Sequence, residues 1–119
     1  MTSDEHLAKA AGILASLGKL SFPDDYLAIV DGATIAGYHL GNALLHSHGV
    51  MPGTEHSNTP SKLDRPISAL PEPIQRAFQA FAELEKLRSD YVRSASVYDE
   101  QLASAVWRHL ETMQRACRE

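Results

Sequence analysis

Apolar residues recur every three or four positions along most of this chain, which is the spacing of one face of an α-helix. The first such run is Leu7, Ala10, Leu14 and Leu17. Just before it, Thr2 and Glu5 stand three residues apart, as in a capping box, where each side chain bonds the backbone N–H of the other residue. We therefore expect a first helix that begins after Thr2 and ends near Gly18.

The same period predicts three further helices. The longest runs from about Asp25 to His48, with Gly49 as its C-terminal cap, and the next from about Glu72 to Tyr91. The last extends to about Cys117, and Ser96 with Asp99 resembles its N-terminal cap. The positions expected to face the core are Tyr26, Ile29, Ala33, Ala36, Leu40 and Leu44, then Ile74, Phe78, Phe81, Leu84, Leu87 and Tyr91, then Leu102, Val106, Leu110, Met113 and Cys117.

Residues 50–72 lack this period and are rich in proline and turn-forming residues. We expect a surface loop over one end of the helices, with a short helical turn from Pro60 to Arg65. No stretch shows the alternation of a β-strand. Four amphipathic helices with short connections predict an all-α fold, an up-and-down antiparallel bundle that occupies residues 1–119 as a single domain.

Composition supports a globular chain, with 44% hydrophobic and 22% charged residues among 119. Cys117 is the only cysteine, so an intrachain disulfide is excluded and a reducing compartment fits. No window approaches the run of about 20 apolar residues that a membrane span needs. The N-terminal residues also lack the cationic and apolar regions of a signal peptide. These features predict a cytoplasmic protein without membrane contact.

The formal net charge is −4. Acidic residues outnumber basic ones in residues 1–72, and the two are balanced in residues 73–119. Binding to a nucleic-acid backbone is driven by excess positive charge, so nonspecific DNA binding is disfavoured.

Ala33, Gly37 and Gly41 are spaced by four inside the longest predicted helix and form a ridge almost without side chains. Glycine in a helix interior costs about 1 kcal/mol relative to alanine. The ridge therefore indicates that another backbone approaches closely, either a helix of the same chain or a second copy in a homodimer.

His39, His46, His48 and His56 raise the question of a metal site. His39 and His46 share a helix face but lie roughly 10 Å apart along the axis. No HExxH motif and no di-iron Glu-x-x-His pair is present. We expect surface or helix-end histidines, no metal and no cofactor, and we expect Cys117 to be a packed thiol.

The segments 35–45, 47–52 and 87–91 together resemble the HEPN superfamily. The first resembles its second-helix pattern, an aromatic residue beside a polar one, followed by small residues and a leucine pair. The second resembles the turn at that helix end, and the third the stretch in which HEPN domains place an arginine ahead of a tyrosine. The similarity covers roughly residues 5–116. It implies a four-helix fold and membership among metal-independent ribonucleases, toxins paired with small nucleotidyltransferases, or noncatalytic subunits of such systems.

The ribonuclease members carry an arginine followed after four to six residues by a histidine. Arg88 fits the arginine, but positions 93–95 read Arg-Ser-Ala, so the histidine is missing. Arginine cannot replace it, because proton transfer needs a group with a pKa near neutrality. The resemblance thus implies a ligand site at Arg88, Asp90, Arg93 and His39. The alternative is that Arg88, Asp90 and Arg93 bind no ligand and form a solvated helix end, where the cations complement the helix dipole.

Three functions remain open from the sequence. The first is a noncatalytic HEPN-like binding or partner subunit that uses Arg88 and Arg93 on a nucleotide or RNA phosphate, with a small nucleotidyltransferase-type protein as its expected partner. The second is a degenerate toxin–antitoxin ribonuclease in which His39 or His109 reaches Arg88 across a homodimer. The third is a protein-docking or homodimerisation module with no nucleotide role.

Overall fold

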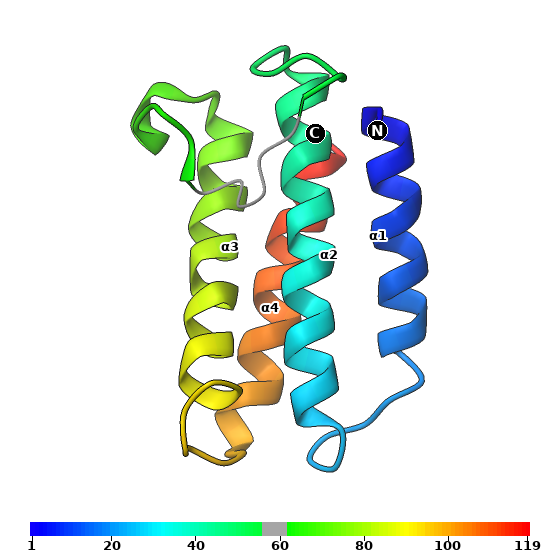
Figure 1. Ribbon diagram of the computed structural model, residues 1–119, viewed down its shortest axis with the longest axis vertical. Helices are drawn as coiled ribbons and strands as arrows, with labels where there is room; N and C mark the ends of the chain where they lie inside the picture. Colours follow the sequence, from blue (N-terminus) through cyan, green and yellow to red (C-terminus); the bar gives the residue numbers. More distant parts are fainter. Residues whose placement is uncertain (56–61) are drawn as a thin grey trace.

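The computed structural model of this chain describes residues 1–55 and 62–119 and contains four main helices. They are α1 (Ser3–Leu17), α2 (Tyr26–Ser47), α3 (Glu72–Tyr91) and α4 (Glu100–Cys117), and a short 3-10 turn, η2 (Ile67–Ala69), precedes α3. The described ranges hold no strand. Successive helices run in opposite directions, as Figure 1 shows. The expected all-α, four-helix bundle is therefore confirmed.

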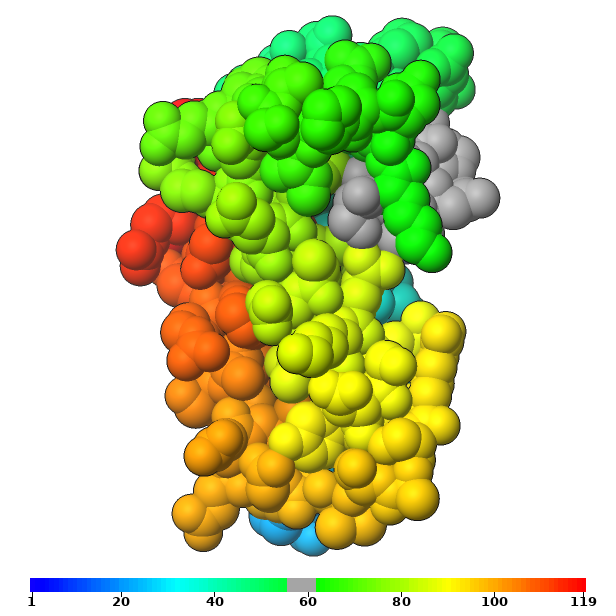
Figure 2. All heavy atoms as spheres, turned by 90° about the vertical axis from the view of Figure 1, so that its left-hand side faces the viewer, coloured from blue at the N-terminus to red at the C-terminus, as the bar shows by residue number. Residues whose placement is uncertain are grey.

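The helices are not equivalent in their packing. α2 contacts each of the other three, and α3 and α4 contact each other, whereas α1 packs chiefly against α2. Figure 1 shows α1 as the outer helix on one side of α2, with α3 on the other side and α4 behind. In Figure 2, α3 and α4 lie next to each other on one face of the molecule, and the segment that precedes α3 lies over the upper end. α1 is thus the peripheral helix of the bundle.

The start of α1 is fixed by the capping box expected from the sequence. Thr2 Oγ1 accepts a hydrogen bond from the Glu5 backbone N–H at 3.1 Å, and Glu5 Oε1 accepts one from the Thr2 N–H at 2.8 Å. These bonds satisfy two donors at a helix end, where the first turn has no intrahelical acceptors.

The other helix ends agree with the sequence except at α4. α2 begins at Tyr26 and ends at Ser47, and Gly49 follows with a φ of 68°, a left-handed conformation that glycine adopts without strain. The expected cap at Ser96 is wrong. α4 begins at Glu100, because Asp99 is itself the N-cap and its Oδ1 accepts a hydrogen bond from the Gln101 N–H at 3.0 Å.

Most of the positions expected to face the core are buried. The partly buried ones are Tyr26, Leu87, Tyr91 and Cys117. Phe78 and Phe81 are the largest fully buried side chains. The core therefore lies between α2, α3 and α4, and α1 closes it through Ala10 and Leu17.

The small-residue ridge faces this core. Ala33, Gly37 and Gly41 are all buried in α2. A Cβ built at Gly37 would lie 2.6 Å from Phe81 Cδ1 of α3 and 3.4 Å from Met113 Sδ of α4. The close approach is thus made by helices of the same chain, and a homodimer contact through this ridge would require the bundle to open.

The helical turn expected at Pro60–Arg65 lies partly outside the described residues. In the described part of the loop, Gln75 Nε2 donates to the Leu70 carbonyl at 2.7 Å and so ties η2 to the start of α3. Among the described residues, no helix is both long enough and apolar enough to cross a membrane.

Candidate functional site

Arg88 lies on α3 and forms an ion pair with Asp31 on α2. Its Nε donates to Asp31 Oδ1 at 2.8 Å, and the two side chains are 38% and 47% exposed. Within the described part of the chain, this is the one hydrogen bond or ion pair of the Arg88 guanidinium. The pair fixes one edge of the guanidinium against α2, and the two terminal nitrogens have no acceptor there.

Asp90 and Arg93 are exposed where α3 ends. Asp90 lines an open hollow between α3 and α4 together with Tyr91, Ser94, Ser96, Val97 and Asp99. The Tyr91 hydroxyl donates to Asp99 Oδ2, and this bond is the main reason that the pKa of Tyr91 is raised. The described lining of this hollow contains the carboxylates of Asp90 and Asp99 and no cationic side chain. The hollow is therefore a poor site for an anion.

His39 does not join this group. It lies eight residues after Asp31 on α2, which is about 12 Å of helix rise. Its ring packs against His6 of α1, with ring centroids 5.2 Å apart. The four residues that the resemblance placed in one ligand site therefore lie in two places, with Arg88, Asp90 and Arg93 on or after α3 and His39 at the α1–α2 interface.

A cluster of three histidines, His6, His39 and His46, occupies that interface. His6 Nδ1 and His39 Nδ1 are 2.9 Å apart, within hydrogen-bond distance. The His6 and His46 rings are stacked, with centroids 5.3 Å apart and an interplanar angle of 29°. His46 Nδ1 lies 3.2 Å from the Met51 carbonyl oxygen. The spacing of His39 and His46 along α2 keeps their rings apart, and the His6 ring of α1 lies between them.

The sequence analysis did not single out His6. The available signal was its position four residues before Ala10, on the apolar stripe of the first helix. His6 is only 2% exposed, so it belongs to the buried face of α1. A histidine on an apolar helical stripe indicates a polar contact across the interface, but the partner can be named only once the neighbouring helix is placed.

The histidine cluster is not arranged to bind a metal. Among residues 1–55 and 62–119, no three histidine, cysteine or acidic side chains are placed to hold a metal ion. Stacked rings such as those of His6 and His46 do not direct their nitrogens at a common point. His56 lies outside the described residues.

The structure also defines the surroundings of Cys117 and His109, two other residues considered from the sequence. Burial raises the pKa of the Cys117 thiol to about 11, and its Sγ donates weakly to the Leu40 carbonyl at 3.7 Å. Such a thiol is a poor nucleophile. His109 on α4 is partly buried, which lowers its pKa, and its electrostatic neighbours are Arg108 and Glu83.

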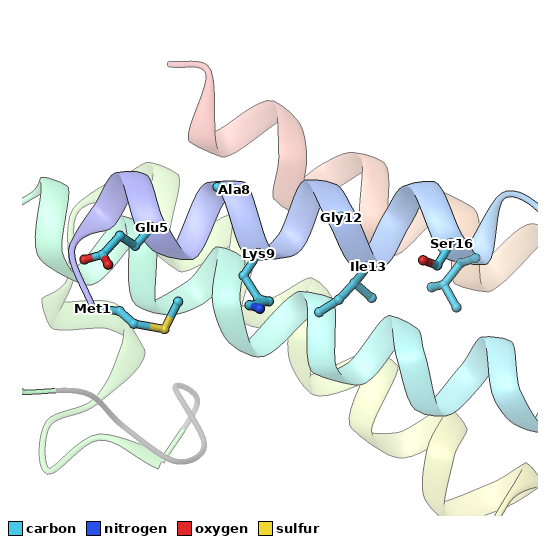
Figure 3. A pocket seen from close by; sticks show the side chains of 8 residues that line it. Met1, Glu5, Ala8, Lys9, Gly12, Ile13 and Ser16 are labelled. Carbon is cyan, nitrogen blue, oxygen red and sulfur yellow. The ribbon is translucent and has the colours of Figure 1, made fainter.

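A shallow hollow runs along one side of α1, and Figure 3 shows the side chains that line it. It is lined by Met1, Glu5, Ala8, Lys9, Gly12, Ile13, Ser16 and Leu17. All of these residues come from the N-terminal segment, and Gly12 opens the hollow because nothing lies within 4 Å of a Cβ built there. One exposed helix side without convergent polar groups does not define a binding site.

Comparison with known proteins adds no further constraint to this geometry. No family model, no curated protein and no solved structure matches the chain.

Proposed function

We propose that this chain is a noncatalytic HEPN-like binding subunit, and that it contacts a phosphate of a nucleotide or RNA through Arg88 at the α2–α3 face. The observation that carries the proposal is the Arg88–Asp31 pair. Asp31 holds the guanidinium by its Nε at 2.8 Å, and the two terminal nitrogens are left for an external acceptor. Arginine is suited to this role, because its planar fork can donate two parallel hydrogen bonds to a phosphate.

A binding role fits the surroundings of Arg88 better than catalysis. RNA cleavage without a metal needs a proton-transfer group next to the arginine. His39, one of the two histidines considered from the sequence, is engaged with His6 at the α1–α2 interface. The group that contacts Arg88 is instead the carboxylate of Asp31, which forms an ion pair with it.

The charge around Arg88 also limits the kind of ligand. Asp31 neutralises part of the guanidinium charge. A long nucleic-acid backbone is attracted by many cations at once. The site therefore suits one phosphate group, such as that of a mononucleotide or an RNA end.

Calorimetric titration of mononucleotides and short RNA into the wild type and Arg88→Ala tests this proposal. Binding by the wild type and its loss in Arg88→Ala is the expected result. Arg76→Ala is the matched control, since Arg76 is an exposed arginine of the same helix, paired with Glu72 at the other end. Equal and negligible binding by the wild type and Arg88→Ala rules out the phosphate role.

A second candidate is a protein-docking module, favoured by an aromatic cluster at the opposite end of the bundle from the chain termini. Phe22 stacks on Tyr98 with ring centroids 5.6 Å apart and meets Trp107 edge-on at 6.2 Å. Trp107 is 40% exposed and Val97 72% exposed. Asp24 and Asp99 stand beside these residues in the sequence, so the occupant we infer is a partner protein with a basic, apolar surface. Trp107 fluorescence in the presence of cationic and anionic amphipathic peptides distinguishes this candidate, because only cationic peptides should shift it.

A further inference from the structure

The three-histidine cluster joins the peripheral helix α1 to the rest of the bundle. His6 is the buried polar residue of α1, and its ring lies between the His39 and His46 rings of α2. Ser3 adds one more polar contact across the interface, since its Oγ donates to the Ala43 carbonyl at 2.9 Å. A change that weakens the contacts among these histidines therefore weakens the attachment of α1 to α2.

The contact between His6 and His39 depends on its proton content. With the two Nδ1 atoms 2.9 Å apart, one must carry a hydrogen and the other must accept it. The neutral pair meets this condition. One added proton on the far nitrogen of the donor ring leaves this bond in place, but it puts a positive charge into a partly buried site where burial and Lys9 oppose a charge on His39. A second added proton sets two N–H groups and two positive charges against each other, which removes the bond.

His46 contributes the third ring of the cluster, which stacks on His6 and contacts the Met51 backbone. Its Nδ1 faces the Met51 carbonyl, which can only accept, so Nδ1 carries the hydrogen and Nε2 is the bare nitrogen of the neutral ring. Nε2 is buried and has no hydrogen-bond partner among the described residues.

The charged and titratable groups around the cluster come from each neighbouring element. α1 supplies Glu5, which interacts electrostatically with His6, and Lys9, which opposes a charge on His39. α2 supplies Tyr38, whose ring meets that of His6 edge-on and whose pKa is raised by burial, so that it stays neutral.

α4 approaches α1 beside the cluster. It contributes Cys117 and Arg118 to a groove that is lined on the α1 side by Leu7, Ala10, Ala11 and Leu14. The Cys117 thiol is neutral at physiological pH, since its pKa is about 11. Arg118 is a fixed positive charge, and its guanidinium forms an ion pair with Glu111.

We propose that the His6–His39–His46 cluster is a pH-sensitive switch that holds α1 on α2 near neutral pH and releases it in acid. The element released is α1, because α2, α3 and α4 pack on one another whereas α1 packs chiefly on α2. Partial opening of one peripheral element needs less free energy than global unfolding.

The direction of the pH effect follows from His39. Burial, followed by the charge of Lys9, lowers the pKa of His39 below its usual value. A histidine on detached α1 or on exposed α2 titrates near its ordinary value of about 6.5. The detached state therefore binds more protons in acid. The attachment is complete above about pH 6.5 and weakens as the pH falls from there through the lowered pKa of His39.

Amide hydrogen exchange of the full chain at pH 7.5 and pH 5.0, corrected for intrinsic exchange rates, tests the switch. We expect α1 amides to gain several-fold in exchange relative to α3 amides at pH 5.0, because the detached state binds more protons there. His48→Gln, which changes an exposed histidine outside the cluster, should respond like the wild type. An equal change in α1 and α3, or no change, overturns the proposal.

The double variant His6→Leu/His39→Leu replaces both partners of the bond by apolar groups, a change that can be nearly neutral for stability. Its α1 amides should lose most of the pH response, and an unchanged response overturns the proposal. If the variant does not fold, a histidine-ring NMR titration of the wild type decides. Coupled titration of the two rings with the pKa of His39 below its ordinary value supports the switch, and titration of His39 at its ordinary value, independent of His6, overturns it.

Discussion

Gly37 of α2 lies directly against the ring of Phe81 on α3, so that a Cβ at position 37 would come within 2.6 Å of Phe81 Cδ1. Phe81 is 2% exposed, and Met113 Sδ of α4, also fully buried, lies 3.4 Å from the same built Cβ, so the ring has little room to move. The absence of a side chain at Gly37 thus sets how closely α2 and α3 approach.

Gly37→Ala should destabilise the fold by about 1–3 kcal/mol, the usual cost of an overpacked core, in spite of the better helix propensity of alanine. Denaturant unfolding measures the change. Gly12→Ala on α1 is the matched control, because a Cβ there meets nothing within 4 Å, and it should stabilise by about 0.5–1 kcal/mol. If Gly37→Ala were as stable as Gly12→Ala, the contact between α2 and α3 would be looser than described.

Thr2→Ala should destabilise α1 by about 1 kcal/mol, because it removes the acceptor of the Glu5 N–H. Hydrogen exchange should show the loss chiefly in the first turn of α1. Thr112→Ala is a suitable comparison, since the exposed Thr112 hydroxyl bonds only the Arg108 carbonyl within its own helix. Equal exchange in the first turn of both variants contradicts the capping role.

The Arg88–Asp31 ion pair should add little to stability. Both side chains are more than a third exposed, and pairs of this kind typically contribute about 0.2–1 kcal/mol. A double-mutant cycle with Arg88→Ala and Asp31→Ala measures the coupling. A coupling above about 2 kcal/mol would mean that Asp31 competes strongly with any phosphate for Arg88, which disagrees with the proposed binding role.

Cys117 should react slowly with alkylating reagents in the folded protein. Burial places its pKa at about 11, roughly two units above the ordinary value, so the thiolate fraction at pH 8 falls about 100-fold. Iodoacetamide labelling followed by mass spectrometry measures the rate, and the denatured chain is the control, because Cys117 is the only cysteine. Equal rates in the folded and denatured chains contradict the burial of this thiol.

Helical period and capping residues predicted most of the fold. The bounds of α3 matched, and α2 differed by one residue at each end, because these signals are local. The start of α4 was misplaced at Ser96, since Asp99 receives a hydrogen bond from Tyr91 of α3 as well as capping its own helix. That contact between two helices is not visible in the local pattern.

The sites were less predictable, because each depends on which helix faces meet. Arg88 was identified from the resemblance, but its partner Asp31 lies 57 residues earlier on another helix. His39 was grouped with Arg88, whereas His6 holds it at a different interface. His6 and His39 are 33 residues apart, and no spacing rule within one helix relates them.

Binding at Arg88 is tested most directly by the NMR signal of its side-chain Nε–H during titration with a mononucleotide. We predict a saturable shift of this signal, with further shifts confined to neighbouring residues of α2 and α3, and their loss in Arg88→Ala. Arg76 provides an internal reference on the same helix and should not shift. An Arg88 signal that stays unchanged to millimolar nucleotide, or shifts equal to those of Arg76, would contradict a phosphate-binding role for this face.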